Sequence, residues 1–76
     1  MVDKVAISKN IGKILKTLRT QRKLSMQNLA TLAEIEKSQI VRIEAGKVDA
    51  KLSTIIILCN ALQVDISDFF KLYEDL

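Results

Sequence analysis

One short segment, between residues 36 and 47, carries side chains whose chemistry suits the edges of nucleic-acid bases. At helical spacing, one side of this segment presents Glu36, Lys37, Ser38, Val41 and Arg42. Lysine and arginine can donate to guanine O6 and N7, serine can donate or accept, valine can pack on a thymine methyl, and glutamate can accept from cytosine N4. Ile40 and Ile43 fall on the opposite side, toward a core. The pattern predicts a base-reading helix, and the alternative is that Lys37 and Arg42 are solvated helix charges.

A second amphipathic segment lies directly before this one and would hold it in place. Ser25 is a favourable N-cap residue, and the apolar spacing that follows it predicts a helix of about two turns through Ala33. Glu34 and Ile35 form a polar break, and Gly46 supplies the left-handed position that ends the later helix. Residues 25–45 therefore have the form of a helix-turn-helix.

Three further helices are predicted around this unit. The first ends near residues 22–23 and begins at either Asp3 or Ser8, with its apolar stripe on Ile7, Ile11, Ile14, Leu15 and Leu18. The fourth is built on Leu52, Ile55, Ile56, Leu58, Cys59 and Leu62. The fifth starts at a capping pair, Asp65 and Asp68, and carries Ile66, Phe69, Phe70 and Tyr73. We expect an all-α, compact five-helix bundle that forms a single domain over residues 1–76.

Composition excludes several classes of function. The chain has 76 residues, of which 49% are hydrophobic, with no histidine and a single cysteine, Cys59. We therefore expect no metal site, no cofactor and no enzymatic activity, because neither a metal-ligand set nor a nucleophile with a nearby base is present. No apolar run has the length of a signal peptide or a membrane span, which predicts a cytoplasmic protein without membrane contact.

Charge is distributed unevenly along the chain. Residues 1–23 carry seven Lys or Arg and one acid, whereas residues 52–76 carry one base and four acids. Lys9, Lys13 and Lys16 form a stripe on the predicted first helix. A solvated face and contact with phosphate explain this stripe about equally well, so its role stays open.

The order and spacing of these motifs resemble one known family. Leu24-Ser25, Leu29-Ala30, residues 42–47 (Arg-Ile-Glu-Ala-Gly-Lys), residues 52–55 and residues 61–64 are similar to the Cro-like phage-repressor (XRE) helix-turn-helix family. The resemblance covers about residues 11–70. It implies a five-helix DNA-binding domain that acts on a two-fold symmetric operator, usually as a homodimer, in a repressor or controller-type transcriptional regulator. The partner would be double-stranded DNA.

The resemblance also implies roles for individual residues. It makes the helix of residues 36–45 the base-reading element, with an ion pair between Arg19 and Glu44 that joins the first helix to its end. Free N–H groups at the start of the second helix suit phosphate, and the candidate phosphate-binding residues are Lys23, Ser25, Gln27, Gln39, Lys47 and Lys51. The sequence departs from the family at Met26, where glutamine is common, and at Glu34, where glycine is common.

Two kinds of protein partner remain open. An apolar patch for a second copy is expected from Ile57, Phe69, Leu72, Tyr73 and Leu76, with Phe69 also directed inward to close the core. The alternative function is an antitoxin-like interaction module, whose acidic C-terminal end holds a basic partner protein and which uses the helix-turn-helix secondarily. Its acidic residues are Asp65, Asp68, Glu74 and Asp75.

Overall fold

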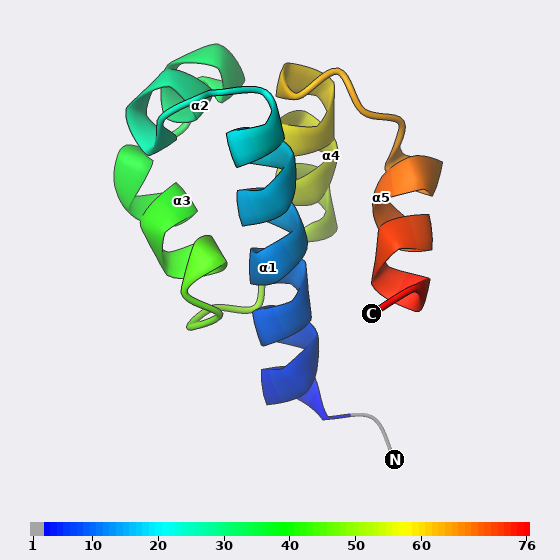
Figure 1. The fold of residues 1–76 in the computed structure, drawn as a ribbon. Coiled ribbons are helices and arrows are strands. Elements are labelled where there is room, and N and C mark those ends of the chain that lie inside the picture. The colour runs from blue at the N-terminus through cyan, green and yellow to red at the C-terminus, as the bar shows by residue number, and fades with distance from the viewer. Residues whose placement is uncertain (1–2) are drawn as a thin grey trace.

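The computed structural model describes residues 3–76, and five helices follow the hydrophobic periodicity of this part of the chain. They are α1 (Lys4–Gln21), α2 (Met26–Ala33), α3 (Lys37–Glu44), α4 (Leu52–Ala61) and α5 (Ile66–Glu74) (Figure 1). The described residues form no strand. The radius of gyration is 11.4 Å, and a compact domain of this length is expected to have about 11 Å. The all-α, five-helix prediction is confirmed.

Helix α1 is the central element. It packs against α3 on one side and α5 on the other, while α2 contacts α3 and α4, and α4 contacts α5. Figure 1 shows that the first turns of α1 extend past the ends of the other helices. The loop between α3 and α4 lies at this same end of the bundle (Figure 1).

The core draws on every helix. Its fully buried large side chains are Leu15, Leu29, Ile40, Leu58, Leu62 and Phe69. Burying a side chain of this size contributes about 1.5 to 3 kcal/mol. Since α2 and α3 have only eight residues each, these contacts rather than helix propensity hold the helix-turn-helix together.

The helix starts agree with the sequence in two cases and correct it in a third. The Val5 N–H donates to Asp3 Oδ1 (2.9 Å), so α1 begins at the first of its two candidate caps. The Asn28 N–H donates to Ser25 Oγ (3.0 Å), the predicted cap of α2. Asp65 is the N-cap residue of α5, as predicted, but its side chain makes no capping bond, so the predicted capping pair with Asp68 does not form. The two carboxylates repel each other. Asp68, in the first turn, therefore stabilises α5 only through its favourable interaction with the positive end of the helix dipole.

Four helices end in the same way, with one residue in the left-handed region. These residues are Lys23, Glu34 and Gln63, each at φ 57°, and Gly46 at φ 70°. The next N–H then donates to the carbonyl five residues earlier, as from Ile35 to Ala30 (3.0 Å) and from Lys47 to Arg42 (3.1 Å). The sequence predicted this ending only at Gly46. At the other three the available signal was the apolar residue that follows, which packs on the core: Leu24, Ile35 and Val64.

Two predicted burial assignments are wrong. Leu52 is 62% exposed and Ile56 is also exposed, although the sequence predicts both among the apolar residues on which α4 is built. Because α4 is apolar on most sides, the 3.6-residue period could not select one face. Phe69 is 1% exposed and lies in the core, which confirms its predicted inward direction and leaves it inaccessible to a second copy.

Candidate nucleic-acid interface

Helix α3 presents a continuous exposed face. The side chains of Lys37, Ser38, Val41 and Arg42 are all exposed, and Glu36, which precedes the helix, is exposed as well. On the reverse side Ile40 is 0% and Ile43 is 3% exposed. The five predicted base-reading residues therefore share an accessible surface, and two isoleucines fix it to the core.

A close backbone approach sets the position of α3 against α1. A Cβ added to Gly12 would lie 2.8 Å from the Glu44 carbonyl oxygen and closer still to that of Ile43. Only glycine leaves room for these two carbonyl groups. The absence of a side chain at residue 12 thus allows the end of α3 to sit directly on α1.

Arg19 and Glu44 make a nearly buried ion pair at the same contact. Arg19 Nε donates to Glu44 Oε2 (2.6 Å) and Nη2 donates to Oε1 (3.0 Å), while Nη1 donates to the Leu24 carbonyl (2.7 Å). The two side chains are 10% and 3% exposed. Hydrogen bonding to Glu44 raises the pKa of Arg19, against the opposing effect of burial. The pair ties α1, the α1–α2 turn and the end of α3 together.

The turn between α2 and α3 adds negative charge beside this face. Glu34 occupies the left-handed position of the turn (φ 57°, ψ 41°), where a non-glycine residue is strained. Glu36 precedes α3 and makes no side-chain capping bond. Both carboxylates are exposed, so each opposes phosphate, whereas Glu36 can also accept a hydrogen bond from a base.

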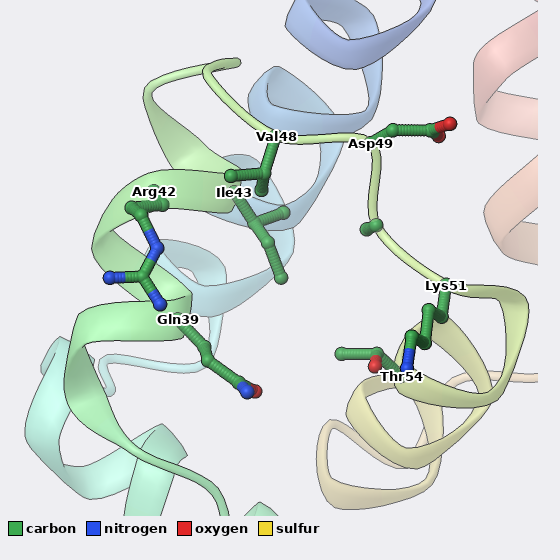
Figure 2. Close-up of a pocket in the computed structure, with 8 residues that line it drawn as sticks. Gln39, Arg42, Ile43, Val48, Asp49, Lys51 and Thr54 are labelled. Carbon is green, nitrogen blue, oxygen red and sulfur yellow. The ribbon is translucent and has the colours of Figure 1, made fainter.

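A hollow of about 240 Å³ opens beside α3, between its second half, the following loop and the start of α4. Figure 2 shows Gln39 reaching from α3 toward the first turn of α4, where Lys51 and Thr54 lie. Ile43 and Val48 also line the hollow. The Asp49 side chain points away from Arg42 (Figure 2). The hollow thus brings together Gln39, Arg42 and Lys51, which the sequence had assigned to DNA separately.

The remaining phosphate candidates lie elsewhere on the chain. Ser25 caps α2, and the first N–H groups of that helix have no partner within it. The Gln27 side chain donates to Thr31 Oγ1 (3.3 Å), so it lies along α2. Lys23 and Lys47 are both exposed; Lys23 belongs to the α1–α2 connection and Lys47 to the α3–α4 connection. These two connections lie at opposite ends of the bundle (Figure 1).

The expected apolar patch is divided in the structure. Ile57 is 43% exposed and lines a hollow between α2 and α4, whereas Leu72 and Leu76 line another between α1 and α5. Tyr73 is half-buried against the core.

Sequence reasoning missed several residues. They are Val48 and Thr54 in the hollow beside α3, and exposed Leu32, Leu52, Ile56 and Phe70. For Thr54, the available signal was its place in the first turn after Lys51.

Among residues 3–76 the only ion pair is that of Arg19 with Glu44, so Lys37 and Arg42 have no acidic partner there. The same residues contain no group of three side chains able to hold a metal ion. None of the described helices combines the length and the apolar character needed to cross a bilayer.

These features match a known protein family. A family model, HTH_3 (helix-turn-helix), matches residues 15–69, which is more than half of the chain. The chain belongs to this helix-turn-helix family. The match includes α2, α3 and the Arg19–Glu44 contact, and it confirms the resemblance drawn from the sequence. No curated protein is similar enough in sequence to match this HTH_3 chain.

Several solved structures share the fold. An HTH_3 family transcriptional regulator from Vibrio cholerae has a TM-score of 0.86 at 29% identity, over 91% of this chain and 39% of that protein. The chain thus spans less than half the length of that regulator. The restriction-modification controller protein C.AhdI from Aeromonas hydrophila has a TM-score of 0.82 at 31% identity, over 86% of this chain and 98% of the controller. The clp gene regulator ClgR from C. glutamicum, at 16% identity and a TM-score of 0.83 over 90% of this chain and 87% of its own, shares the fold.

Proposed function

We propose that this protein is a transcriptional regulator of the repressor or controller type, which binds a two-fold symmetric DNA operator as a homodimer. The observation that carries the proposal is the exposed face of α3, which keeps its polar side chains free while Ile40 and Ile43 anchor its reverse side. Family membership and the likeness to a transcriptional regulator and a controller protein support it.

Base reading is assigned to α3. Lys37 and Arg42 donate to guanine, Ser38 donates or accepts, Val41 packs on a thymine methyl, and Glu36 accepts from cytosine. Each good bidentate contact contributes about 1 to 3 kcal/mol of discrimination between bases. The Arg19–Glu44 pair and the Gly12 contact hold this face at a fixed angle to α1.

Phosphate binding is assigned to both flanks of α3. On one flank lie Lys23, Ser25 and Gln27 at the start of α2; on the other lie Gln39, Lys47 and Lys51 around the hollow and its loop. A helix that fills the major groove, about 12 Å wide, has a phosphate backbone on each side. Cations on both flanks suit that geometry.

The second copy would bind through exposed apolar side chains of α4 and α5. The candidates are exposed Ile57 and Leu72, half-buried Tyr73, and exposed Leu76 just after α5; Leu52, Ile56 and Phe70 are exposed as well. An interface between identical copies is self-complementary, and two recognition helices must lie about 34 Å apart to enter successive major grooves.

Selection of bound sequences from random duplex DNA tests the function. We expect an enriched palindrome whose half-sites are about 10 bp apart, centre to centre. Recovery of no common sequence, with binding that depends on duplex length alone, would refute sequence-specific regulation.

Sedimentation of the free protein tests the dimer separately. We expect a dimer at micromolar concentration that Ile56→Lys, Ile57→Lys or Leu72→Lys weakens, according to which residues form the contact. A monomer at high micromolar concentration, both with and without DNA, would contradict the homodimer.

A further inference from the structure

We propose that Lys9, in the first half of α1, makes an additional DNA phosphate contact at the C-terminal end of α3. This inference rests on the proposed binding of DNA through α3. It resolves the open role of one member of the lysine stripe on α1, and it extends the DNA interface to a helix outside the helix-turn-helix.

The position of Lys9 follows from its contact with Gly46. A Cβ added to Gly46 would lie 2.8 Å from Lys9 Cγ and 2.9 Å from Lys9 Cα. The base of the Lys9 side chain therefore lies against the residue that ends α3. Lys47 follows Gly46 directly, and both lysines are exposed. Two cations consequently flank the point where the chain leaves α3.

This end of α3 is where a phosphate backbone would be met. The helix has eight residues, or about 12 Å, which is close to the width of the major groove. A helix of that length spans the groove from side to side, so the residues that follow its last turn lie near the rim of the groove. Duplex DNA carries one negative phosphate charge per about 1.7 Å of its axis, so cations at the rim of the groove can pair with a phosphate.

The local charges favour an anion. The carbonyl groups at the end of α3 carry the negative end of its dipole, which would repel phosphate unless cations offset it. Neither Lys9 nor Lys47 takes part in an ion pair within residues 3–76. Asp49, the acid in the following loop, lines one hollow with Arg42 and Lys51 and another with Ile7 and Ser8, but it forms no ion pair with Lys9 or Lys47.

Lys13, one turn further along α1, provides a matched control. Its side chain lines the hollow between α1 and α5 together with Leu72 and Asp75, away from α3. Lys9→Gln and Lys13→Gln remove the same charge from the same helix. A general effect of net charge would act on both variants alike, whereas a phosphate contact at the end of α3 would respond to Lys9 alone.

The test is the salt dependence of affinity for the selected duplex. For Lys9→Gln we expect the slope of log K against log [salt] to become less negative by about 0.9, the value for one phosphate contact. Lys13→Gln keeps the wild-type slope, and Lys9→Arg restores it. An unchanged slope for Lys9→Gln overturns the inference, as does an equal change for both glutamine variants.

Three measurements separate this inference from other outcomes. If Lys9→Gln lowers the urea midpoint but leaves the salt slope unchanged, Lys9 only stabilises the end of α3, and the inference is refuted. If Arg42→Ala reduces specific binding while Lys9→Gln leaves the slope unchanged, the inference fails and the proposed function stands. If the wild-type protein shows no specific binding, the proposed function fails as well.

Discussion

Replacing either partner of the Arg19–Glu44 pair is expected to remove a large part of the protein's stability. A chain of 76 residues has a free energy of unfolding of about 4 to 11 kcal/mol. Breaking a buried pair costs about 3 to 5 kcal/mol, because the remaining charge stays buried without a partner. Both side chains are nearly buried here and share two hydrogen bonds. Arg19→Met or Glu44→Leu is therefore expected to leave the protein only marginally folded.

The double variant separates the interaction from the loss of either side chain. Arg19→Met with Glu44→Leu leaves no unpaired charge, so its destabilisation is expected to fall short of the sum of the single variants by up to about 3 kcal/mol. Arg19 also donates to the Leu24 carbonyl, so some cost remains in the double variant. Urea unfolding followed by circular dichroism at constant m-value gives the four free energies.

Salt provides the control. A buried pair is weakly screened, so the cost of Glu44→Leu is expected to change little between about 0.05 and 0.5 M salt. A cost below about 1 kcal/mol for Glu44→Leu would refute the reasoning, because that is the range of exposed pairs.

Three further predictions concern single positions. Gly12→Ala is expected to destabilise the protein by about 1 to 3 kcal/mol in urea unfolding, although alanine favours helices, because its Cβ meets two carbonyl groups of α3; a stabilised variant would contradict this. Glu34→Gly is expected to raise the melting temperature, since relief of the left-handed strain, about 1 kcal/mol, exceeds the entropic cost of glycine; an equal or lower melting temperature would contradict it. Burial raises the pKa of the Cys59 thiol above 9.0, so the unfolded chain loses this proton first and stability falls as pH rises past 9.0. Cys59→Ala is expected to remove that part of the slope, and an identical slope in both proteins would refute it.

Much of the fold could be predicted from sequence because α1, α2 and α3 are amphipathic. Their apolar residues recur at the helical spacing of three or four residues. The Ser25 hydroxyl caps the start of α2, and Gly46 adopts the left-handed conformation that ends α3. Helix α4 lacks this contrast. With isoleucine or leucine on most sides, only the tertiary arrangement shows that Ile55 is buried and Leu52 exposed.

The candidate interface could be predicted for α3 but only in part for its surroundings. The period of the helix is enough to place Ile40 and Ile43 opposite Arg42. The hollow that joins Gln39 to Lys51 and Thr54 depends on how the α3–α4 loop folds back, and no local pattern encodes that path. The contact of Lys9 with Gly46 joins residues far apart in the chain, so the lysine stripe alone could not reveal it.

The central claim, that the exposed face of α3 lies against bases, is tested most directly by one affinity measurement. The selected duplex and a duplex of random sequence are titrated with wild type, Lys37→Ala, Arg42→Ala and the α5 control Lys71→Ala. We expect Lys37→Ala and Arg42→Ala each to weaken specific binding by about 5- to 150-fold, equivalent to about 1 to 3 kcal/mol, with a small change on random DNA and none for Lys71→Ala. Unchanged affinity for the selected duplex in both α3 variants would contradict the claim.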